Sequence, residues 1–413
     1  MSSLTDQDIQ KWVDEIMAKK GINNYKLDIA NSSAKGEGYL GEISFVKVTT
    51  DEGRNDEKVY DMVVKSAKEN DKLRESCPIA ETYLREIQVY AELFPIIEAL
   101  QKEYCIKNAF THYPKLYKVN KEDKKETLIL QNIKSLGYEL HERSKPQNFE
   151  HILFVFRTYA KFHGASLALK AKKPHIFEKL ASKMSDIMAE FLIQSQMIPN
   201  FQKHHQKSIE LLRKAGRRDL AEKMEEEAKD LKEILTTMTL PNDREAEAEA
   251  VFLHGDCWNN NMMFKYKDND TSRPSDIVFL DFQLTRVASP ILDLSYYIYA
   301  VADKPALDNI DYFLEEYHRE LGDYLRQYKI NVEDMLTLRR LKASWRKYGR
   351  YGLGMTPFIL RVELCKEDEV IDFTDKIADG SIQDEEIGEI QKQDEYNRRI
   401  LNIYRHFSEK FLS

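Results

Sequence analysis

Two short apolar runs each lead into an aspartate, and the first is also followed by an asparagine. Val251–Leu253 comes shortly before Asp256, and Asn261 follows five residues later, while Ile277–Leu280 ends directly at Asp281. In phosphoryl transfer a carboxylate must meet the acceptor hydroxyl, and oxygen ligands must hold the metal ions that neutralise the phosphates. The spacing therefore predicts a phosphotransferase, with Asp256 as catalytic base and with Asn261 and Asp281 as ligands of Mg²⁺.

A structural explanation exists for each of these residues alone. Aspartate is common in hairpin turns and as a capping residue at strand ends. A plain hairpin is disfavoured because His254, Gly255 and Trp258 occur in the same stretch as Asp256. Asp281 gains weight because it follows Asp256 by 25 residues at the end of a second strand-like run. Asn269 and Pro274 are expected to mark the turn between the two strand-like stretches.

A glycine-rich stretch lies near the N-terminus. Gly36, Gly38 and Gly41 follow the pattern GxGxxG, which would let backbone N–H groups approach phosphates. In dinucleotide-binding proteins the same pattern opens a helix. Here the following residues, Glu42–Thr50, have the pattern of a strand. We therefore expect a strand–loop–strand cover over the nucleotide phosphates, and a plain hairpin turn explains the glycines equally well.

Two charged residues complete the candidate site. Lys65 ends the apolar run Met62–Val64, and Glu86 lies on the helix predicted to follow. A lysine at this strand end would contact the nucleotide phosphates, and the glutamate would hold it through an ion pair. Each alone is better explained as a surface charge. The order of glycine loop, strand lysine, helix glutamate, Asp/Asn loop and strand aspartate is what favours a site.

Two further polar residues are expected to play supporting roles. His163 is predicted to be a packing histidine without a role in the chemistry. Asp293 follows Asp281 by twelve residues and is expected to support the Asp256 loop by hydrogen bonding rather than to touch substrate. The short interval leaves little room for the activation loop of a protein kinase, and no Ala-Pro-Glu sequence occurs. The expected acceptor is therefore a small molecule.

Composition excludes several other classes. A net charge of −8 and a pI of about 5.8 argue against a nucleic-acid-binding protein. The four cysteines form no CxxC pair, which indicates a reducing compartment and no structural zinc site. The polar N-terminus has no signal-peptide region, and no apolar run approaches the roughly 18 residues of a membrane span. We expect a cytoplasmic protein without membrane association, and no protein partner is implied.

Periodic patterns divide the chain into a β-rich first third and a mostly helical remainder. Apolar alternation predicts strands over residues 26–30, 42–50, 59–65, 115–119 and 127–130. Spacings of three and four predict helices over residues 5–20, 80–102, 149–169, 177–198, 203–237 and within 306–413. Thr5 is a candidate N-cap, and Pro95 is expected to break or kink its helix. The pattern predicts an α+β fold.

These motifs together resemble the ecdysteroid kinase-like proteins of arthropods, also called choline-kinase-like, within the protein-kinase-like superfamily. The similarity runs from about Tyr25 to beyond Tyr351. Its most specific residues are His254–Trp258 with Asn261, Asp281–Gln283, Ser289-Pro290 and Asp293-Leu294. Glu86-Ile87 with Tyr90 and Pro95, and Lys161–His163, are also similar.

The resemblance implies an ATP- and Mg²⁺-dependent kinase with two lobes. Residues 1–131 would form an N-lobe with a small antiparallel sheet and one long helix, 132–137 a hinge, and 138–413 a larger helical C-lobe carrying the catalytic loop and acceptor site. The family's best-known reaction phosphorylates the 22-hydroxyl of ecdysteroids. Backbone groups at Gln131 and Ile133 would hold the adenine. Many members carry Glu-Asp where this chain has Gln131-Asn132, which leaves the side-chain contacts between the lobes open.

Other readings keep the fold and change the function. A choline or aminoglycoside kinase would need an acidic or aromatic cage for a cationic acceptor. Some family members are thought to phosphorylate foreign compounds, and a nucleotide-binding pseudokinase is disfavoured because Lys65, Asp256, Asn261 and Asp281 are all present. Acceptor-pocket residues are expected from the helices between 177 and 240 and from the C-terminal third. There, the aromatic residues could form a pocket wall, although core packing is favoured: Trp345, Tyr348, Tyr351 and Phe358.

Overall fold

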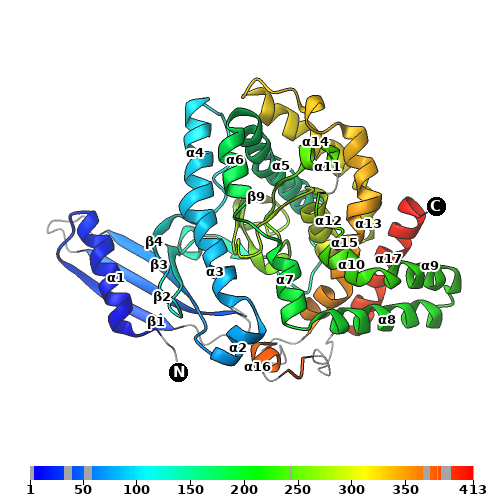
Figure 1. The fold of residues 1–413 in the computed structure, drawn as a ribbon, viewed down its shortest axis with the longest axis horizontal. Helices are drawn as coiled ribbons and strands as arrows, with labels where there is room; N and C mark the ends of the chain where they lie inside the picture. The colour runs from blue at the N-terminus through cyan, green and yellow to red at the C-terminus, as the bar shows by residue number, and fades with distance from the viewer. Residues whose placement is uncertain are drawn as a thin grey trace.

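The computed structural model describes residues 4–31, 40–50, 58–241, 244–365, 373–378, 380–382 and 392–412. A smaller N-terminal part built on a β-sheet lies beside a larger, mostly helical C-terminal part (Figure 1). The expected α+β, two-lobed fold class is confirmed. The expected boundaries at residues 131, 132 and 137 stay a prediction.

The N-terminal sheet has five antiparallel strands in the order β1-β2-β3-β5-β4. The strands are β1 (Tyr25–Asn31), β2 (Gly41–Thr50), β3 (Val59–Ala67), β4 (Leu116–Asn120) and β5 (Thr127–Gln131). All five lie where the apolar alternation predicted them. The central strand β3 therefore brings Lys65 to the middle of the sheet, between Ile43 on β2 and Leu128 on β5.

Helix α1 (Asp6–Lys19) confirms the helix predicted over residues 5–20, and it covers one face of this sheet (Figure 1). Thr5 and Asp8 form a capping box, in which each side chain bonds the other residue's backbone N–H. The helix buries one apolar stripe against the strands, which makes a core separate from that of the helical part. This stripe consists of Ile9, Trp12, Val13, Ile16 and Met17.

The helix predicted over residues 80–102 forms one continuous rod with a π turn in the middle. It consists of α3 (Ile79–Gln88), the π turn η1 (Val89–Leu93) and α4 (Phe94–Glu103). Pro95 has no N–H to donate to a helical hydrogen bond. The wider π turn directly before it lets the helix continue without that bond. The rod is therefore neither broken nor stopped at Pro95, and Glu86 of α3 and Phe94 of α4 are both buried.

The chain passes between the two parts directly after β5. Asn132 bonds β3 twice, from its backbone N to Asp61 O at 2.9 Å and from Nδ2 to Asp61 Oδ1 at 3.0 Å. Ile133 is buried with Met263 and Val278 of the C-terminal part. At this crossing Asn132 therefore bonds the N-terminal sheet, while Ile133 packs against the C-terminal part.

The C-terminal part is built mostly on helices, with α14 and α6 packed against α5 and α12 packed against α15. They are α5 (Phe149–Lys172), α6 (Pro174–Ala181), α7 (Ile187–Gln194), α8 (Ile198–Lys214), α9 (Arg218–Lys229), α10 (Leu231–Thr236), α11 (Arg244–Glu249), α12 (Ile291–Val301), α13 (Lys304–Leu307), α14 (Ile310–Arg326), α15 (Leu338–Leu364), α16 (Phe373–Ala378) and α17 (Gln393–Phe411). The helices expected over 149–169 and within 306–413 are confirmed.

Two predicted long helices are wrong in their extent. The helix expected over 177–198 is divided into α6 and α7, because Asp186 accepts a hydrogen bond from Ala189 N and caps a new helix. The helix expected over 203–237 is divided into α8, α9 and α10. Its first break falls at Gly216, whose φ of +74° ends α8 in the left-handed region. The apolar periodicity continues across both breaks, so it could not reveal them.

Short strands carry the loops of interest. β7 (Val251–Phe252) pairs with β10 (Val287–Ala288), while β8 (Met262–Tyr266) lies between β6 (Glu139–Leu140) and β9 (Pro274–Phe279). The expectation that the two aspartate-bearing runs are joined by one turn is therefore wrong. The turn near Asn269 joins β8 to β9. The sequence did not indicate strand β8.

No helix among the described residues is both long and apolar enough to span a bilayer. Cys77, Cys105, Cys257 and Cys365 are free thiols.

Candidate active site

Asp256 lies on a loop of residues 254–261, here called the Asp256 loop, between β7 and β8. Gly255 has a φ of +88°, and a Cβ at this position would lie 2.2 Å from the Leu284 backbone oxygen. Only glycine fits such an approach. The Asp256 loop is therefore held tightly against the segment that follows Asp281. Asp281 itself has a φ of +62°, which is unusual for a residue other than glycine.

Three donors orient the Asp256 carboxylate. Asn261 Nδ2 donates to Oδ2 at 2.7 Å, Trp258 Nε1 donates to Oδ2 at 3.2 Å, and the Tyr296 hydroxyl donates to Oδ1 at 3.1 Å. Burial, together with the nearby charge of Asp281, raises the pKa of Asp256 to about 6. A carboxylate with this pKa is still ionised at neutral pH and is a stronger base than an ordinary aspartate.

Lys65 joins the sheet, the rod and the Asp281 segment. Its Nζ lies 2.7 Å from Glu86 Oε2 and 2.9 Å from Asp281 Oδ1. Burial alone would lower the pKa of Lys65, but the carboxylates of Asp281 and Glu86 raise it above its usual value, so the side chain stays charged. The structure thus brings together three of the residues selected from the sequence.

Asp293, on α12, holds the Asp256 loop from behind. Its carboxylate accepts hydrogen bonds from His254 N at 2.8 Å, Gly255 N at 3.0 Å and the Cys257 thiol at 3.0 Å. Burial opposes its charge, but the hydrogen bond from His163 helps hold the pKa of Asp293 below its usual value. The expectation that Asp293 supports this loop by hydrogen bonding is confirmed.

His163 is fully buried and is not among the residues that line the cavity described below. Its Nε2 lies 3.1 Å from Asp293 Oδ2, and its Nδ1 lies 2.9 Å from the Tyr317 hydroxyl. With Nε2–H donating to Asp293, Nδ1 accepts from Tyr317. His163 is therefore a packing residue, as expected, and it also orients Asp293, which the sequence did not indicate.

The far side of the Asp256 loop is anchored by a second network. Gln147 Nε2 donates to Asn259 Oδ1 at 2.8 Å, and the Tyr297 hydroxyl donates to Gln147 Oε1 at 2.5 Å. Asn259 Nδ2 also donates to the His141 backbone oxygen at 3.2 Å. With both sides bonded, the loop has little freedom to shift relative to α12.

Asn261 and Asp281 offer the oxygen ligands that Mg²⁺ prefers. The Asn261 amide nitrogen is used by Asp256, which leaves the amide oxygen available, and Asp281 contributes a partly exposed carboxylate. No cluster of three or more histidine, cysteine or acidic residues that could hold a metal occurs in the described part of the chain. One carboxylate and one amide suit Mg²⁺ that also binds phosphate oxygens and water.

The remaining selected residues are less closely connected to this centre. Gly36 and Gly38 lie outside the described residues. A Cβ on Gly41 would meet the Tyr83 hydroxyl at 1.7 Å, so packing alone requires glycine there. Gln131 ends β5, and neither it nor Ile133 lines the cavity that contains Asp256.

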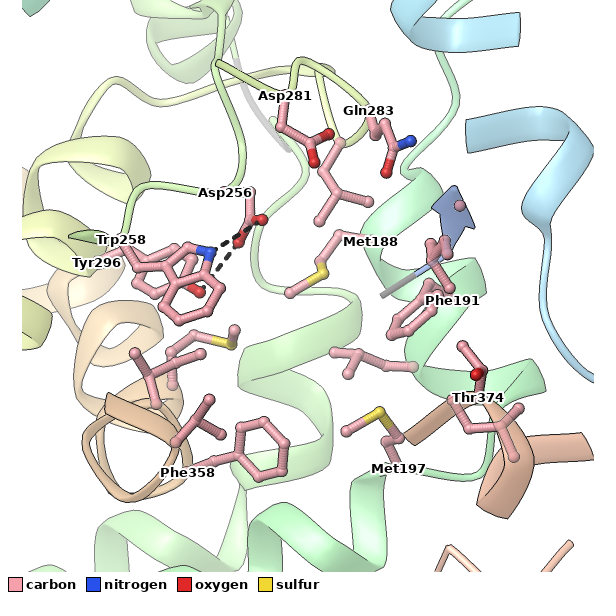
Figure 2. A pocket seen from close by; sticks show the side chains of 18 of the residues that line it. Met188, Phe191, Met197, Asp256, Trp258, Asp281, Gln283, Tyr296, Phe358 and Thr374 are labelled. Atoms are coloured by element: carbon pink, nitrogen blue, oxygen red, sulfur yellow. Dashed lines mark hydrogen bonds between the residues drawn. The ribbon is translucent and has the colours of Figure 1, made fainter. Parts of the chain in front are cut away.

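A large cavity adjoins the carboxylates (Figure 2). It encloses about 1020 Å³ of empty space, part of it open to solvent. Asp256, Asp281 and Gln283 lie at one end of the view, and Met197 and Phe358 lie at the other. Its apolar lining residues are Leu40, Met188, Phe191, Leu192, Met197, Phe201, Leu284, Met355, Phe358, Ile359, Val362 and Ile377.

The cavity draws on the regions expected to supply an acceptor pocket. Its apolar walls come from α7, α8, α15 and α16. Of the four aromatic residues considered from the sequence, only Phe358 lines it, while Trp345, Tyr348 and Tyr351 are buried in the core. Among the described lining residues, only Asp256 and Asp281 are acidic.

Sequence reasoning missed Tyr296, which lines the cavity and bonds Asp256. Tyr296 lies three residues after Asp293, so both side chains face the Asp256 loop from one side of α12. This spacing was visible in the sequence. A buried apolar helix, however, carries several tyrosines, and only the packing of α12 distinguishes Tyr296 from Tyr297 and Tyr299.

Comparison with known proteins adds three findings. The model of the ecdysteroid kinase-like family matches residues 35–330, more than half of the chain. No curated protein sequence matches this chain.

Among solved structures, two GDP complexes of aminoglycoside 2′-phosphotransferase-IIIa are similar. One is a point mutant, with 11% identity, a TM-score of 0.39 and 97% of each chain covered. The other is the wild type, with 12% identity, a TM-score of 0.38, and 97% of this chain and 99% of that chain covered.

Proposed function

The chain belongs to the ecdysteroid kinase-like family, and from this premise we propose that it transfers the γ-phosphoryl group of ATP to a hydroxyl of an ecdysteroid or a similar apolar alcohol. Membership of this family makes it a small-molecule kinase, a phosphotransferase that acts on hydroxyl acceptors. The nucleotide, the metal and the acceptor are the parts that we propose here.

One observation carries the choice of acceptor. The carboxylate of Asp256 and the apolar side chains of α7, α8, α15 and α16 line the same cavity. Pockets for drug-sized ligands measure roughly 300–1,000 Å³ and combine apolar walls with a few polar groups. A largely apolar molecule with one hydroxyl directed at Asp256 fits this division into a polar and an apolar end.

Each residue around Asp256 would have its own role in the reaction. Asp256 accepts the proton of the acceptor hydroxyl while the hydroxyl oxygen attacks the γ-phosphorus and the bond to the departing ADP breaks. Trp258, Asn261 and Tyr296 keep the carboxylate oriented through their hydrogen bonds. The apolar walls exclude water, which would otherwise compete with the acceptor for the phosphoryl group.

Lys65, Asn261 and Asp281 would hold the nucleotide and its metal. Bound Mg²⁺ supplies positive charge to the phosphate oxygens during transfer. Lys65 is held in a charged state by the carboxylates of Asp281 and Glu86, and it would contact the phosphates. Backbone groups at Gln131, Ile133, Gly36, Gly38 and Gly41 are the proposed contacts for the rest of ATP.

The test is turnover by the purified protein with ATP and Mg²⁺ against ecdysteroids, plant sterols, phenols and choline. Mass spectrometry would detect a product that has gained one phosphate. We expect phosphorylated ecdysteroid and no phosphocholine. Phosphorylation confined to polar or cationic acceptors would contradict the proposed acceptor class and leave the family assignment intact.

A choline-type acceptor is the second candidate, because the cavity also contains aromatic rings. Trp258, Phe201 and Phe358 line it, and aromatic rings attract quaternary ammonium groups. An aminoglycoside is less suited, since it carries several positive charges and the described lining offers only the two carboxylates assigned to the chemistry. Phosphocholine formation would favour this second candidate.

A further inference from the structure

One wall of the cavity comes from a segment near the C-terminus that lies against the N-terminal part. Thr374 and Ile377 of α16 line the cavity, and both are about 3% exposed. In Figure 1, α16 lies directly beside α2 (Asp71–Ser76), and the two helices pack against each other. Since Leu40, Lys65 and Tyr83 also line the cavity, it is built from both the N-terminal and the C-terminal part.

A side-chain hydrogen bond joins this wall to the strand that carries Lys65. Lys68 Nζ donates to Thr374 Oγ1 at 2.8 Å. Lys68 follows Lys65 by three residues, just past the end of β3, and its backbone oxygen accepts from Arg74 Nε of α2 at 2.8 Å. A movement of β3 relative to the C-terminal part would therefore move α16 as well.

The other end of the same segment is fixed to the C-terminal part. Asn200, buried on α8, donates from Nδ2 to the Ile382 backbone oxygen at 3.1 Å, and Ile382 is itself buried. Phe201, the next residue of α8, lines the cavity together with Thr374 and Ile377. The described residues of this C-terminal segment thus contact α2 through α16 and α8 through Ile382.

We propose that α16 is a specificity-determining wall of the acceptor site whose position depends on the nucleotide. The proposal rests on the function proposed above and extends it to how the two substrates bind. When ATP contacts Lys65, the lobes close around the nucleotide. Strand β3 then moves together with Lys68 and with its partner Thr374, and the apolar cavity narrows around the acceptor. Nucleotide and acceptor should then bind cooperatively, and each should raise the affinity for the other by the same factor.

A neutral apolar dye can test this without knowledge of the natural acceptor. Nile red fluorescence would report its Kd for the full-length protein with and without Mg²⁺ and a non-hydrolysable ATP analogue. We expect the analogue to tighten dye binding by about five-fold or more, within the usual range for coupled sites. No dye binding, or the same Kd with and without nucleotide, would overturn the proposal.

Two variants remove the hydrogen bond between Lys68 and Thr374, and one matched variant keeps it. Lys68→Met and Thr374→Val should each reduce the coupling towards one-fold, and the double variant should do no more than either alone. Lys72→Met removes an exposed lysine of α2 and should retain the full coupling. Circular dichroism and thermal unfolding would show that all variants fold. Full coupling in both Lys68→Met and Thr374→Val would count against a wall positioned by β3.

A size change tests the wall itself. Ile377→Trp should fill space in the cavity and weaken dye binding by about ten-fold, with the affinity for the ATP analogue unchanged. Ile193→Trp, on an exposed position of α7, is the control and should change neither affinity. Dye binding unaffected by Ile377→Trp would show that α16 is not part of the site.

Failure of this inference can be distinguished from failure of the proposed function. Coupled dye binding without any phosphorylated ecdysteroid would contradict only the ecdysteroid assignment. Phosphorylated ecdysteroid with uncoupled dye binding would contradict only the role of α16.

Discussion

The two ends of the cavity are held by different forces. At the polar end, Asp256 and Lys65 are fixed by directional bonds of 2.7 to 3.2 Å to named partners. At the apolar end, Met188 and Phe191 contribute apolar side chains to the wall, where hydrophobic contacts have no preferred direction. The polar end therefore tolerates little change in residue type, whereas the apolar end tolerates many shapes of similar volume.

The two proposed substrates make different demands on the two ends of the cavity. A phosphoryl group and a metal ion have fixed geometry, so the residues that meet them must be placed within a fraction of an ångström. An apolar acceptor needs mainly volume and the exclusion of water. The three methionines of the cavity, Met188, Met197 and Met355, are adaptable side chains that suit such a site. Substitutions at the two ends should therefore have different kinetic signatures.

The largest effect is expected at the polar end. Asp256→Asn keeps the shape of the side chain and removes its ability to accept a proton, so kcat should fall by about 10²–10⁴-fold. The affinity for ATP, measured by calorimetry, should stay within about two-fold, because Asp256 is not a proposed nucleotide ligand. Turnover near the wild-type rate would remove Asp256 from its proposed role.

The next largest effect should come from the support behind that carboxylate. Asp293→Asn takes away an ionised acceptor that three donors of the Asp256 loop and His163 share, so the free energy of unfolding should fall by roughly 3 kcal/mol. Urea unfolding at neutral pH would measure it, with the exposed Asp334→Asn as control. A change below about 0.5 kcal/mol would show that the loop does not depend on this residue.

At the apolar end, Phe358→Ala should change binding rather than chemistry. Losing a phenylalanine contact of about 1.5–3 kcal/mol would raise the KM for a large apolar acceptor by roughly 10–100-fold, with little change in kcat. Ile193→Ala, on the exposed side of α7, provides the comparison and should leave KM unchanged. A fall in kcat with constant KM would place Phe358 in the chemistry and remove the distinction between the two ends.

The smallest effect is expected where the ends meet. Tyr296→Phe removes one hydrogen bond of 3.1 Å to Asp256 and keeps the ring that lines the cavity, so kcat should fall by about ten-fold. The KM for the acceptor should stay the same. If KM rises instead, the Tyr296 hydroxyl contacts the acceptor rather than orienting the base.

The same contrast explains what could be predicted from the sequence. Lys65, Glu86, Asp256, Asn261 and Asp281 were selected because phosphoryl transfer needs those residue types in that order, and the structure places them around one centre. Their catalytic roles stay predictions. The strands of the N-terminal sheet were also predictable, since alternation and strand-end turns are local properties.

The apolar end could not be predicted residue by residue. Met188 and Phe201 have the helical spacing of ordinary core residues, and only the packing of α7 and α8 leaves a space beside them. The breaks at Asp186 and Gly216 depend on caps that the apolar period does not register. Strand β8 was missed because its pairing with β9 is set by tertiary structure rather than by its own short pattern.

The π turn in the rod has a consequence for insertions and deletions. It adds one residue between α3 and α4, and each residue of an α-helix rotates the following side chains by about 100°. Glu86 must face Lys65 on one side of the turn, while Phe94 must face Tyr113 and Phe282 on the other. Deleting a single residue from Val89–Leu93 would place these two faces out of phase, so that either the ion pair or the aromatic contacts must be lost.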